Sequence, residues 1–211
     1  QTVVPSGLAA VVFATIPITS ALIARAFGLE RLDPLKMGGA VIALGGVALL
    51  FAHDLTASVT ALPLLAIYLA TVAAALGSTM LKRGPRQDPM AANAVAAAVG
   101  VPFCLLASWL LHETRQLPTH WVQIYPILYL AIAGSVGAFV VFAWLVNHWQ
   151  VSTIAFIGVV VPVIAVTLGV LVRHERLLRE HLLGSLLVLA GVMLAIASDR
   201  RRMRQARAVS P

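Results

Sequence analysis

The sequence has very little charge. Of its 211 residues, 11% are Asp, Glu, Lys or Arg and 60% are hydrophobic, with a mean hydropathy of +0.94. A soluble globular domain carries about 25% charged residues, so this chain has too few to cover a surface that faces water. The composition therefore excludes an ordinary soluble domain and predicts an integral membrane protein whose solvent is lipid.

Cysteine and the common motifs of catalysis are also scarce. The single cysteine, Cys104, lies in an apolar run, so no disulfide can form within the chain. The six histidines lie at the ends of apolar runs and none pairs at the spacing of metal ligands. No glycine-rich phosphate loop, nucleophile elbow or pair of carboxylates on one helix face is present. We therefore expect no metal, no cofactor and no catalytic residue.

Seven apolar runs are separated by charged, proline-containing or glycine-containing connections. They do not alternate in polarity, and lipid admits only helices or closed barrels, so the sequence predicts an all-α, polytopic membrane helix bundle. Most runs approach the roughly 20 residues that cross a bilayer. The predicted helices are 4–28, 36–52, 61–82, 89–111, 122–147, 151–173 and 181–198.

Two stretches of the chain, 17–49 and 162–194, repeat one pattern without a gap. Each has a proline inside an apolar run, then Glu-Arg-Leu, then two glycines, and every element of the second copy follows the first by 145 residues. Chance rarely places these residue types in one register, so we infer an internal duplication. The matching residues are Pro17 and Pro162, Glu30-Arg31 and Glu175-Arg176, Gly39 and Gly184, and Gly46 and Gly191.

The duplication predicts how the chain is organised. Three predicted helices precede the second proline helix, and their counterparts in the first copy would lie before residue 1. We expect repeats of five helices, the first represented by 1–53 and the second by 61–198, so that this chain holds the last seven of ten crossings. Because five is odd, the two repeats face opposite ways in the membrane, the inverted-repeat architecture of many secondary carriers.

Lysine and arginine are distributed unevenly between the two sides of the predicted bundle. Eleven of the 15 fall on the side of the first, third and fifth connections and of the tail, 199–211. The positive-inside bias then places the C-terminus in the cytoplasm, in a multi-pass protein of the plasma or inner membrane. A basic tail directly after a membrane helix indicates contact with anionic lipid rather than with nucleic acid.

The repeated motif resembles that of the EamA-type permeases of the drug/metabolite transporter superfamily. Their hallmark is a helix with a proline and a closing Glu-Arg-Leu, followed by a glycine-rich helix. Here the first copy runs from Pro17 to Leu32 and on to Gly46-Val47, and the second from Pro162 to Leu177 and on to Gly191-Val192. The resemblance covers essentially all of the chain, as helices four to ten of a ten-helix family, and implies a transporter.

Polar and aromatic residues within the predicted helices are candidates for a substrate path. Tyr68, Thr71 and Ser78 are spaced to share one face of helix 61–82, and Tyr129, Trp144 and Asn147 share one face of helix 122–147 together with Tyr125. Tyr125 and Trp144 also suit the membrane interface, and Ser or Thr can bond its own helix. The remaining candidates are Thr15, Pro17, Asn93, Pro162 and Thr167.

The repeated residues have more than one reading. Pro17 and Pro162 free a backbone carbonyl, either for the substrate path or as part of a static kink. Glu30 and Glu175 lie at helix ends beside arginine, and we expect each to fix the turn between two helices. The glycines, Gly39, Gly46, Gly184 and Gly191, are expected to allow close helix approach.

These observations favour a secondary transporter that moves a small organic solute, such as an amino acid, metabolite or drug, by alternating access. The resemblance implies export. No acidic or basic residue lies deep in a predicted helix, so any coupling group belongs to the absent helices, or the protein is a facilitator. A membrane enzyme acting on lipid or a lipid-linked sugar, and a scaffold without transport activity, remain alternatives. The oligomeric state is not predicted.

Overall fold

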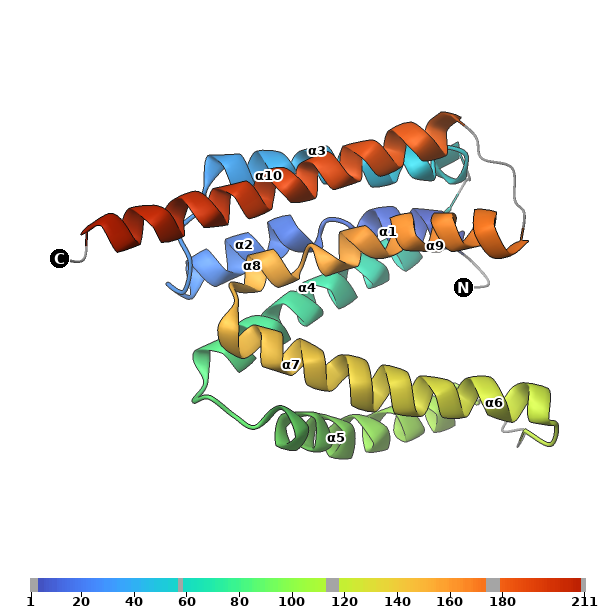
Figure 1. Cartoon of the computed structure of the whole chain (residues 1–211). Helices are drawn as coiled ribbons and strands as arrows, with labels where there is room; N and C mark the ends of the chain where they lie inside the picture. Colours follow the sequence, from blue (N-terminus) through green and yellow to red (C-terminus); the bar gives the residue numbers. More distant parts are fainter. Residues whose placement is uncertain (1–3, 57–58, 113–117, 174–178, 210–211) are drawn as a thin grey trace. The chain divides into compact units, whose positions relative to one another are not determined.

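The structure is a computed structural model of the whole chain, and it describes residues 4–56, 59–112, 118–173 and 179–209. Every regular element in these ranges is helical, as the all-α prediction requires (Figure 1). Six stretches are long and apolar enough to cross a membrane, and a seventh, Pro34–Leu50, is shorter at 17 residues. The elements are α1 (Ser6–Phe13), α2 (Ile16–Ala26), α3 (Pro34–Leu50), the 3₁₀ turn η1 (Asp54–Thr56), α4 (Ala61–Arg83), α5 (Pro89–Leu110), α6 (Trp121–Tyr129), the π-helix η2 (Leu130–Ala138), α7 (Phe139–His148), α8 (Val151–Ile154), α9 (Ile157–Arg173) and α10 (Arg179–Val209).

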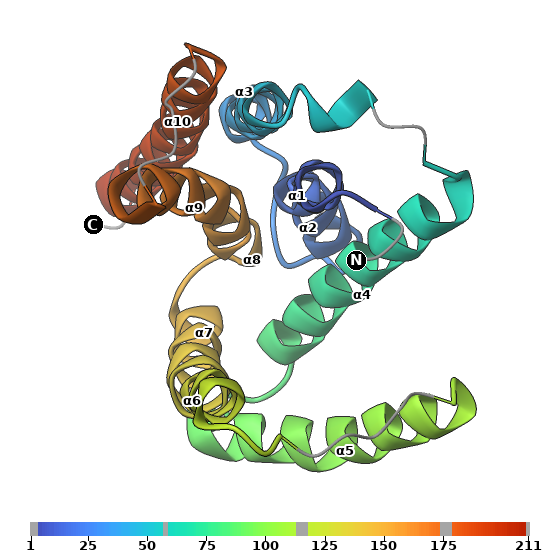
Figure 2. The ribbon, with the colours of Figure 1, turned by 90° about the vertical axis from the view of Figure 1, so that its right-hand side faces the viewer.

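The first predicted helix is broken at its centre. Helix α1 ends at Phe13 and α2 begins at Ile16, and the two continue in line with each other (Figure 2). Pro17 explains the break, because it has no N–H to bond the carbonyl four residues earlier and its ring crowds that turn. The hydroxyl of Thr15 instead donates to the carbonyl of Val12 at 2.7 Å.

The sixth predicted helix is also broken, but at a different point of the repeated pattern. Helix α8 ends at Ile154 and α9 begins at Ile157, whereas Pro162 lies inside α9. The prediction of continuous helices over 4–28 and 151–173 was therefore wrong at these two points. The last prediction was too short, since α10 continues to Val209: the residues after Asp199 are good helix formers without proline or glycine until Pro211.

The chain forms two compact units, which we describe separately. The large unit contains residues 1–83 and 150–211, and the small unit contains residues 84–149. These units are defined by contacts in space, whereas the division into 1–53, 61–198 and 199–211 follows the sequence repeat and stays a prediction.

Helices α3 and α10 pack along each other through their glycines in the large unit. A Cβ atom built on Gly39 would lie 2.5 Å from the carbonyl oxygen of Gly191, and one on Gly46 would lie 2.7 Å from that of Gly184. The order of contacts along the two helices is reversed, so they run antiparallel. Any side chain at these positions would force the backbones apart, and lipid supplies no hydrophobic drive that would hold them together.

The core of the large unit surrounds this crossing. It consists mainly of small and branched apolar residues, with one phenylalanine, from α3, α9 and α10 and from the turns after α1 and α8. Helix α4 adds a separate buried stripe of three residues at successive turns, Thr71, Ala75 and Thr79, where it packs against α1 and α2. The core residues are Ala14, Ala40, Ala43, Val47, Leu50, Phe156, Val159, Val163, Val188 and Ala195.

The small unit pairs α5 with the long helical stretch formed by α6, η2 and α7. This stretch spans Trp121–His148 without a break, but its nine central residues, Leu130–Ala138, are wound as a π-helix. The sequence predicted an ordinary α-helix over 122–147, so the π-helical segment within it was not predicted. Two asparagines connect the partners: Asn93 donates to the carbonyl of Ser135 at 2.8 Å, and Asn147 donates to that of Gln87 at 3.0 Å.

Candidate functional site

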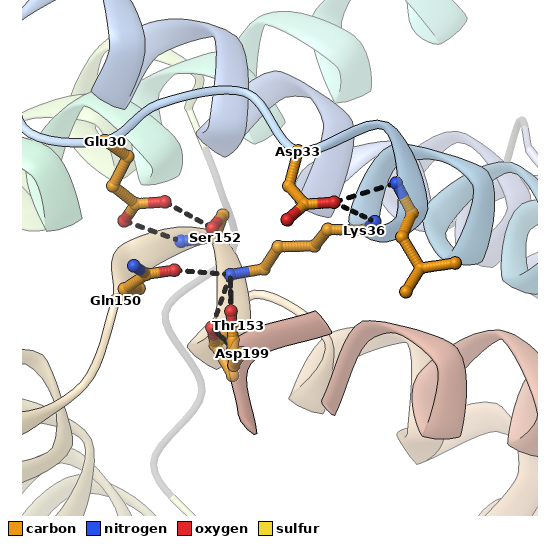
Figure 3. Close-up of polar contacts among 8 residues, drawn as sticks. Glu30, Asp33, Lys36, Gln150, Ser152, Thr153 and Asp199 are labelled. Carbon is orange, nitrogen blue, oxygen red and sulfur yellow. Dashed lines mark hydrogen bonds and ion pairs between the residues drawn. The ribbon is translucent and has the colours of Figure 1, made fainter. Parts of the chain in front are cut away.

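The turn between α2 and α3 determines how Lys36 is placed at one end of the large unit. Gly28 has a φ of +72°, a left-handed conformation that glycine adopts at little cost and that reverses the chain after α2. Asp33 then caps α3, accepting hydrogen bonds from the backbone N–H of Leu35 at 2.8 Å and of Lys36 at 3.4 Å. As a result Lys36 lies in the first turn of α3 with its side chain directed at α8 and α10 (Figure 3).

Lys36 is buried in a polar cluster at this end. Its side chain is 7% exposed, and its ammonium group pairs with the carboxylate of Asp199 at 3.0 Å. The same nitrogen donates to Gln150 Oε1 at 2.8 Å and to Thr153 Oγ1 at 2.6 Å, and the Thr153 hydroxyl in turn donates to Asp199 (Figure 3). Every proton of the ammonium group therefore has an acceptor, as a buried charge requires. We call Lys36, Gln150, Thr153 and Asp199 the Lys36 cluster.

Glu30 lies beside the Lys36 cluster and bonds the start of α8. Its carboxylate accepts a short hydrogen bond from the Ser152 hydroxyl and a second from the Ser152 backbone N–H at 3.3 Å. We expected Glu30 to fix the turn between its own two helices, and this role stays a prediction, while Gly28 and the Asp33 cap contribute to that turn. The carboxylate of Glu30 also connects the turn to a segment more than 120 residues later in the chain.

Sequence reasoning missed the Lys36 cluster, although a signal for it was present. The helix-end residues looked like ordinary interfacial charge because Lys36 and Asp199 are far apart in the sequence. Within the repeat the offset of 145 pairs Lys36 with His181, and a short extension of the repeat pairs Asp54 with Asp199. Acidic and basic residues thus occupy matching positions at both ends of the glycine-rich helices.

The predicted substrate-path residues of α4 do not share one environment. Thr71 is fully buried, whereas Tyr68 is 43% exposed. The hydroxyls of Thr71 and Ser78 donate to the carbonyls of their own helix four residues earlier, at 3.0 and 2.8 Å. Thr71 packs in the buried stripe with Thr79, a residue that the sequence analysis did not single out.

The predicted path residues of the small unit fall into two groups. Asn93 and Asn147 connect backbone segments through the two amide bonds described above. Tyr125, Tyr129 and Trp144 are 72%, 62% and 48% exposed, and Trp144 stacks on His148 with ring centroids 4.5 Å apart. The asparagines thus have a clear packing role, and the aromatic rings lie on the outside of this unit.

The remaining predicted residues lie in the broken helices of the large unit. Pro17 and Pro162 are buried, and Thr167 donates its hydroxyl to the carbonyl of Val163 at 2.7 Å. Thr15 closes the end of α1 in the same way. Of the structural motif, Arg31 lies in the turn before α3, and Glu175 and Arg176 lie outside the described residues.

The arrangement is an ion pair within a hydrogen-bond network that connects α3 with α8 and α10. No group of three or more His, Cys, Asp or Glu side chains that could hold a metal occurs in the part of the chain that the structure describes. Within the Lys36 cluster the charge of Lys36 is paired with that of Asp199, and the Lys36 ammonium group and the Thr153 hydroxyl both have acceptors. Removing one partner of such a pair is costly, because the other charge is then buried without compensation.

Comparison with known proteins identifies the family. The EamA-like transporter family matches residues 61–197, which is more than half of the chain. The chain belongs to this family. The resemblance seen in the repeated motif is thereby confirmed, and the protein is a membrane transporter rather than an enzyme.

Individual relatives agree with this assignment. The chain is 28% identical to a probable amino-acid metabolite efflux pump of Salmonella typhimurium, over 94% of this chain and 70% of the relative. It is 25% identical to the uncharacterized transporter YoaV of Bacillus subtilis, over 94% and 69%, and 27% identical to the uncharacterized inner membrane transporter YedA of Escherichia coli K12, over 92% and 63%. The chain thus spans 63–70% of the length of these relatives.

A solved structure agrees with the fold. One crystal structure matches with a TM-score of 0.68 at 20% identity, over 92% of this chain and 70% of that chain. At this identity the likeness concerns the fold alone.

Proposed function

We propose that this EamA-family chain is the larger part of a secondary transporter built from two inverted five-helix repeats, which moves a small organic solute out of the cell by alternating access. Residues 1–53 belong to the first repeat and 61–198 to the second. The C-terminal tail lies in the cytoplasm and contacts lipid. The observation that carries this proposal is a reciprocal set of contacts at the crossing of α3 and α10.

The contacts at this crossing occur in pairs related by the offset of 145. Gly39 meets Gly191, and its counterpart Gly184 meets Gly46, which is the counterpart of Gly191. Two further pairs follow the same rule. In the second pair, a Cβ on Gly46 would lie 2.7 Å from the backbone nitrogen of Val188, and one on Gly191 would lie 2.7 Å from that of Ala43. In the third pair, a Cβ on Gly39 would lie 3.2 Å from the backbone nitrogen of Ala195, and one on Gly184 would lie 2.9 Å from that of Leu50.

Reciprocity of this kind is the mark of a two-fold axis. When residue i of one copy meets residue j of the other, and j of the first also meets i of the second, the two copies are related by a half-turn. Here the helices are antiparallel, so the reciprocal contacts support a half-turn whose axis lies in the membrane plane. An inverted repeat has this relation between its halves, which in secondary carriers rock around a central substrate site.

The nature of the solute is inferred from the relatives and from the predicted path. One relative is named as a probable amino-acid metabolite efflux pump, which supports a small organic solute and outward movement. The path candidates are hydroxyl, amide and aromatic groups rather than charged ones, which suits a zwitterionic or neutral solute. Among the described residues the Lys36 cluster adds ionisable groups at one end, so coupling to a proton gradient belongs in the test.

The test is transport by the full-length gene product reconstituted in proteoliposomes. Amino acids and cationic dyes are loaded inside, and their release is measured with and without a proton gradient. We expect release of at least one solute class above that of empty liposomes. A Gly46→Val variant is expected to lose this release and a Gly45→Val variant to keep it, because a Cβ on Gly45 meets nothing within 4 Å. No movement of any solute under any gradient would overturn the proposal.

A further inference from the structure

The Lys36 cluster joins the two proposed repeats at one end of the large unit. Lys36 and Glu30 come from the first repeat, whereas Gln150, Ser152, Thr153 and Asp199 come from the later part of the chain. All the bonds of Lys36 and Glu30 named above therefore run from the first repeat to the second or to Asp199, the residue directly after it. Separating the repeats at this end would break every one of them at once.

At the opposite end of the large unit, the residues equivalent to the Lys36 cluster are of different chemical types. The offset of 145 carries Lys36 to His181, Asp199 to Asp54 and Ser152 to Gly7. Asp54 begins η1, and its carboxylate fills the space that a Cβ on Gly7 would need. It therefore lies against the start of α1, as Asp199 lies against Thr153 at the start of α8.

His181 has the position of Lys36 but not its bonds. Its Nδ1 atom is buried and has no hydrogen-bond partner among the described residues. A buried polar atom without a partner is unusual and costs stability. In a carrier with two states, a group left unpaired in one state is explained if it is paired in the other.

Inverted repeats exchange their conformations when the carrier switches. A contact between the repeats at one end in the first state therefore becomes the equivalent contact at the other end in the second. Applied here, Lys36 with Asp199 in one state corresponds to His181 with Asp54 in the other. We propose that the Lys36 cluster is a latch that closes one end of the carrier, and that His181 and Asp54 form the matching latch at the opposite end in the alternate state.

The two latches are unequal, and this sets the resting state. The Lys36 ammonium group has three different acceptor groups, whereas the counterparts of Thr153 and Gln150 are Leu8 and Pro5, which offer no side-chain acceptor. The carrier therefore rests with the Lys36 end closed. This inference depends on the proposed alternating access, but its test needs no solute.

The experiment reports opening at the Lys36 end through a cysteine. Val151, the first residue of α8, is 2% exposed and lies between Gln150 and Ser152, so Val151→Cys in a Cys104→Ser background is shielded while the latch is closed. The rate of alkylation by N-ethylmaleimide is measured on the full-length protein in liposomes. Lys36→Met is expected to raise the rate at least tenfold, and Lys36→Arg, which keeps the charge, by less than threefold.

The decisive variant lies at the far end. His181→Lys supplies the charge and reach of the stronger latch, so it is expected to raise alkylation at Val151→Cys at least threefold, although α3 separates the two ends by about 25 Å. Adding Asp54→Asn is expected to return the rate to its starting value, and His148→Lys, on an exposed histidine of the small unit, to leave it unchanged.

Each outcome bears on the latch alone. If His181→Lys leaves alkylation unchanged while Lys36→Met raises it, Lys36 is a local structural pair and the proposal is overturned. If Lys36→Met itself has no effect, no latch exists at that end; should this variant fail to fold, Thr153→Val, which removes one acceptor of Lys36, is expected to raise the rate by a smaller factor. If His181→Lys raises alkylation at Val151→Cys but no solute is released in the transport assay, the result counts against the proposed function and not against the latch.

Discussion

In the large unit, α3 and α10 bring glycine, alanine and valine into direct backbone contact, whereas α5, α6 and η2 of the small unit contain no buried residue. The small unit has side-chain amides in place of this packing: Asn93 and Asn147 bond the carbonyls of Ser135 and Gln87. Lipid tails are as apolar as leucine, so helices in a membrane associate through close packing or polar contacts. The large unit thus relies on close packing and the small unit on polar contacts, within one chain.

The largest effect is expected when the close packing of α3 against α10 is disrupted. Gly46→Val should destabilise the large unit by about 3 kcal/mol, because its side chain would overlap the backbone of Gly184 and Val188. Thermal unfolding of the purified protein in detergent measures this. Gly45→Val, on the exposed side of the same helix, is the matched control, and an equal loss in both variants would contradict a role for the glycine crossing.

A smaller effect is expected when a side-chain amide contact of the small unit is removed. Asn93→Ala removes the bond to the carbonyl of Ser135 and should cost about 1 kcal/mol, the usual scale for a polar contact between membrane helices. The loss is measured as a shift of the unfolding midpoint. Ser78→Ala, whose hydroxyl bonds its own helix, should show almost no shift. If the two variants behave alike, side-chain amides do not hold the small unit together.

The two units can also be compared through one kind of cap. Asp33 caps α3 in the large unit, and Asp88 caps α5 in the small unit by accepting from the N–H of Ala91 at 2.9 Å. Loss of a cap costs about 1 kcal/mol, so Asp88→Ala should lower stability by that amount. Asp33→Ala should cost more, since this cap also orients Lys36. Equal losses would mean that the turn before α3 does not position the Lys36 cluster.

The smallest effect concerns a buried hydroxyl of the large unit. Thr71→Val keeps the shape of the side chain and removes a hydroxyl that bonds the carbonyl of Ile67. We expect a change below about 0.5 kcal/mol, because the carbonyl keeps its helical partner. Unfolding in detergent again gives the answer, and a loss above 2 kcal/mol would show that the hydroxyl makes a contact between helices.

Much of the fold was predictable because membrane helices have a strong signal in the sequence. Length and apolar composition located the helical segments, and Pro17 correctly indicated disturbance of the first one. The breaks themselves were missed, since hydropathy does not register a lost turn. The π-helix at Leu130–Ala138 was missed for the same reason: its residues, including Gly134 and Gly137, are apolar in either winding.

The site was harder to predict than the fold because its residues meet only in three dimensions. Glu30 was recognised from its motif, but its partner Ser152 lies in a short segment that carries no signal of its own. Lys36 and Asp199 appeared as separate helix-end charges, and their burial follows from the glycine crossing that brings α3 against α10. The repeat offset showed only that charged or titratable residues occupy equivalent positions, since it pairs Lys36 with His181 and Asp54 with Asp199.

The most direct test of the account asks whether equivalent residues of the two repeats face opposite sides of the membrane. Pro34 and Arg179 are separated by the repeat offset of 145, begin α3 and α10, and are both exposed. Each is replaced by cysteine in a Cys104→Ser background and labelled in intact cells with a membrane-impermeant maleimide. Inverted repeats predict labelling of Arg179→Cys from outside and of Pro34→Cys only after the cells are opened; labelling of both from the same side would contradict the inverted architecture.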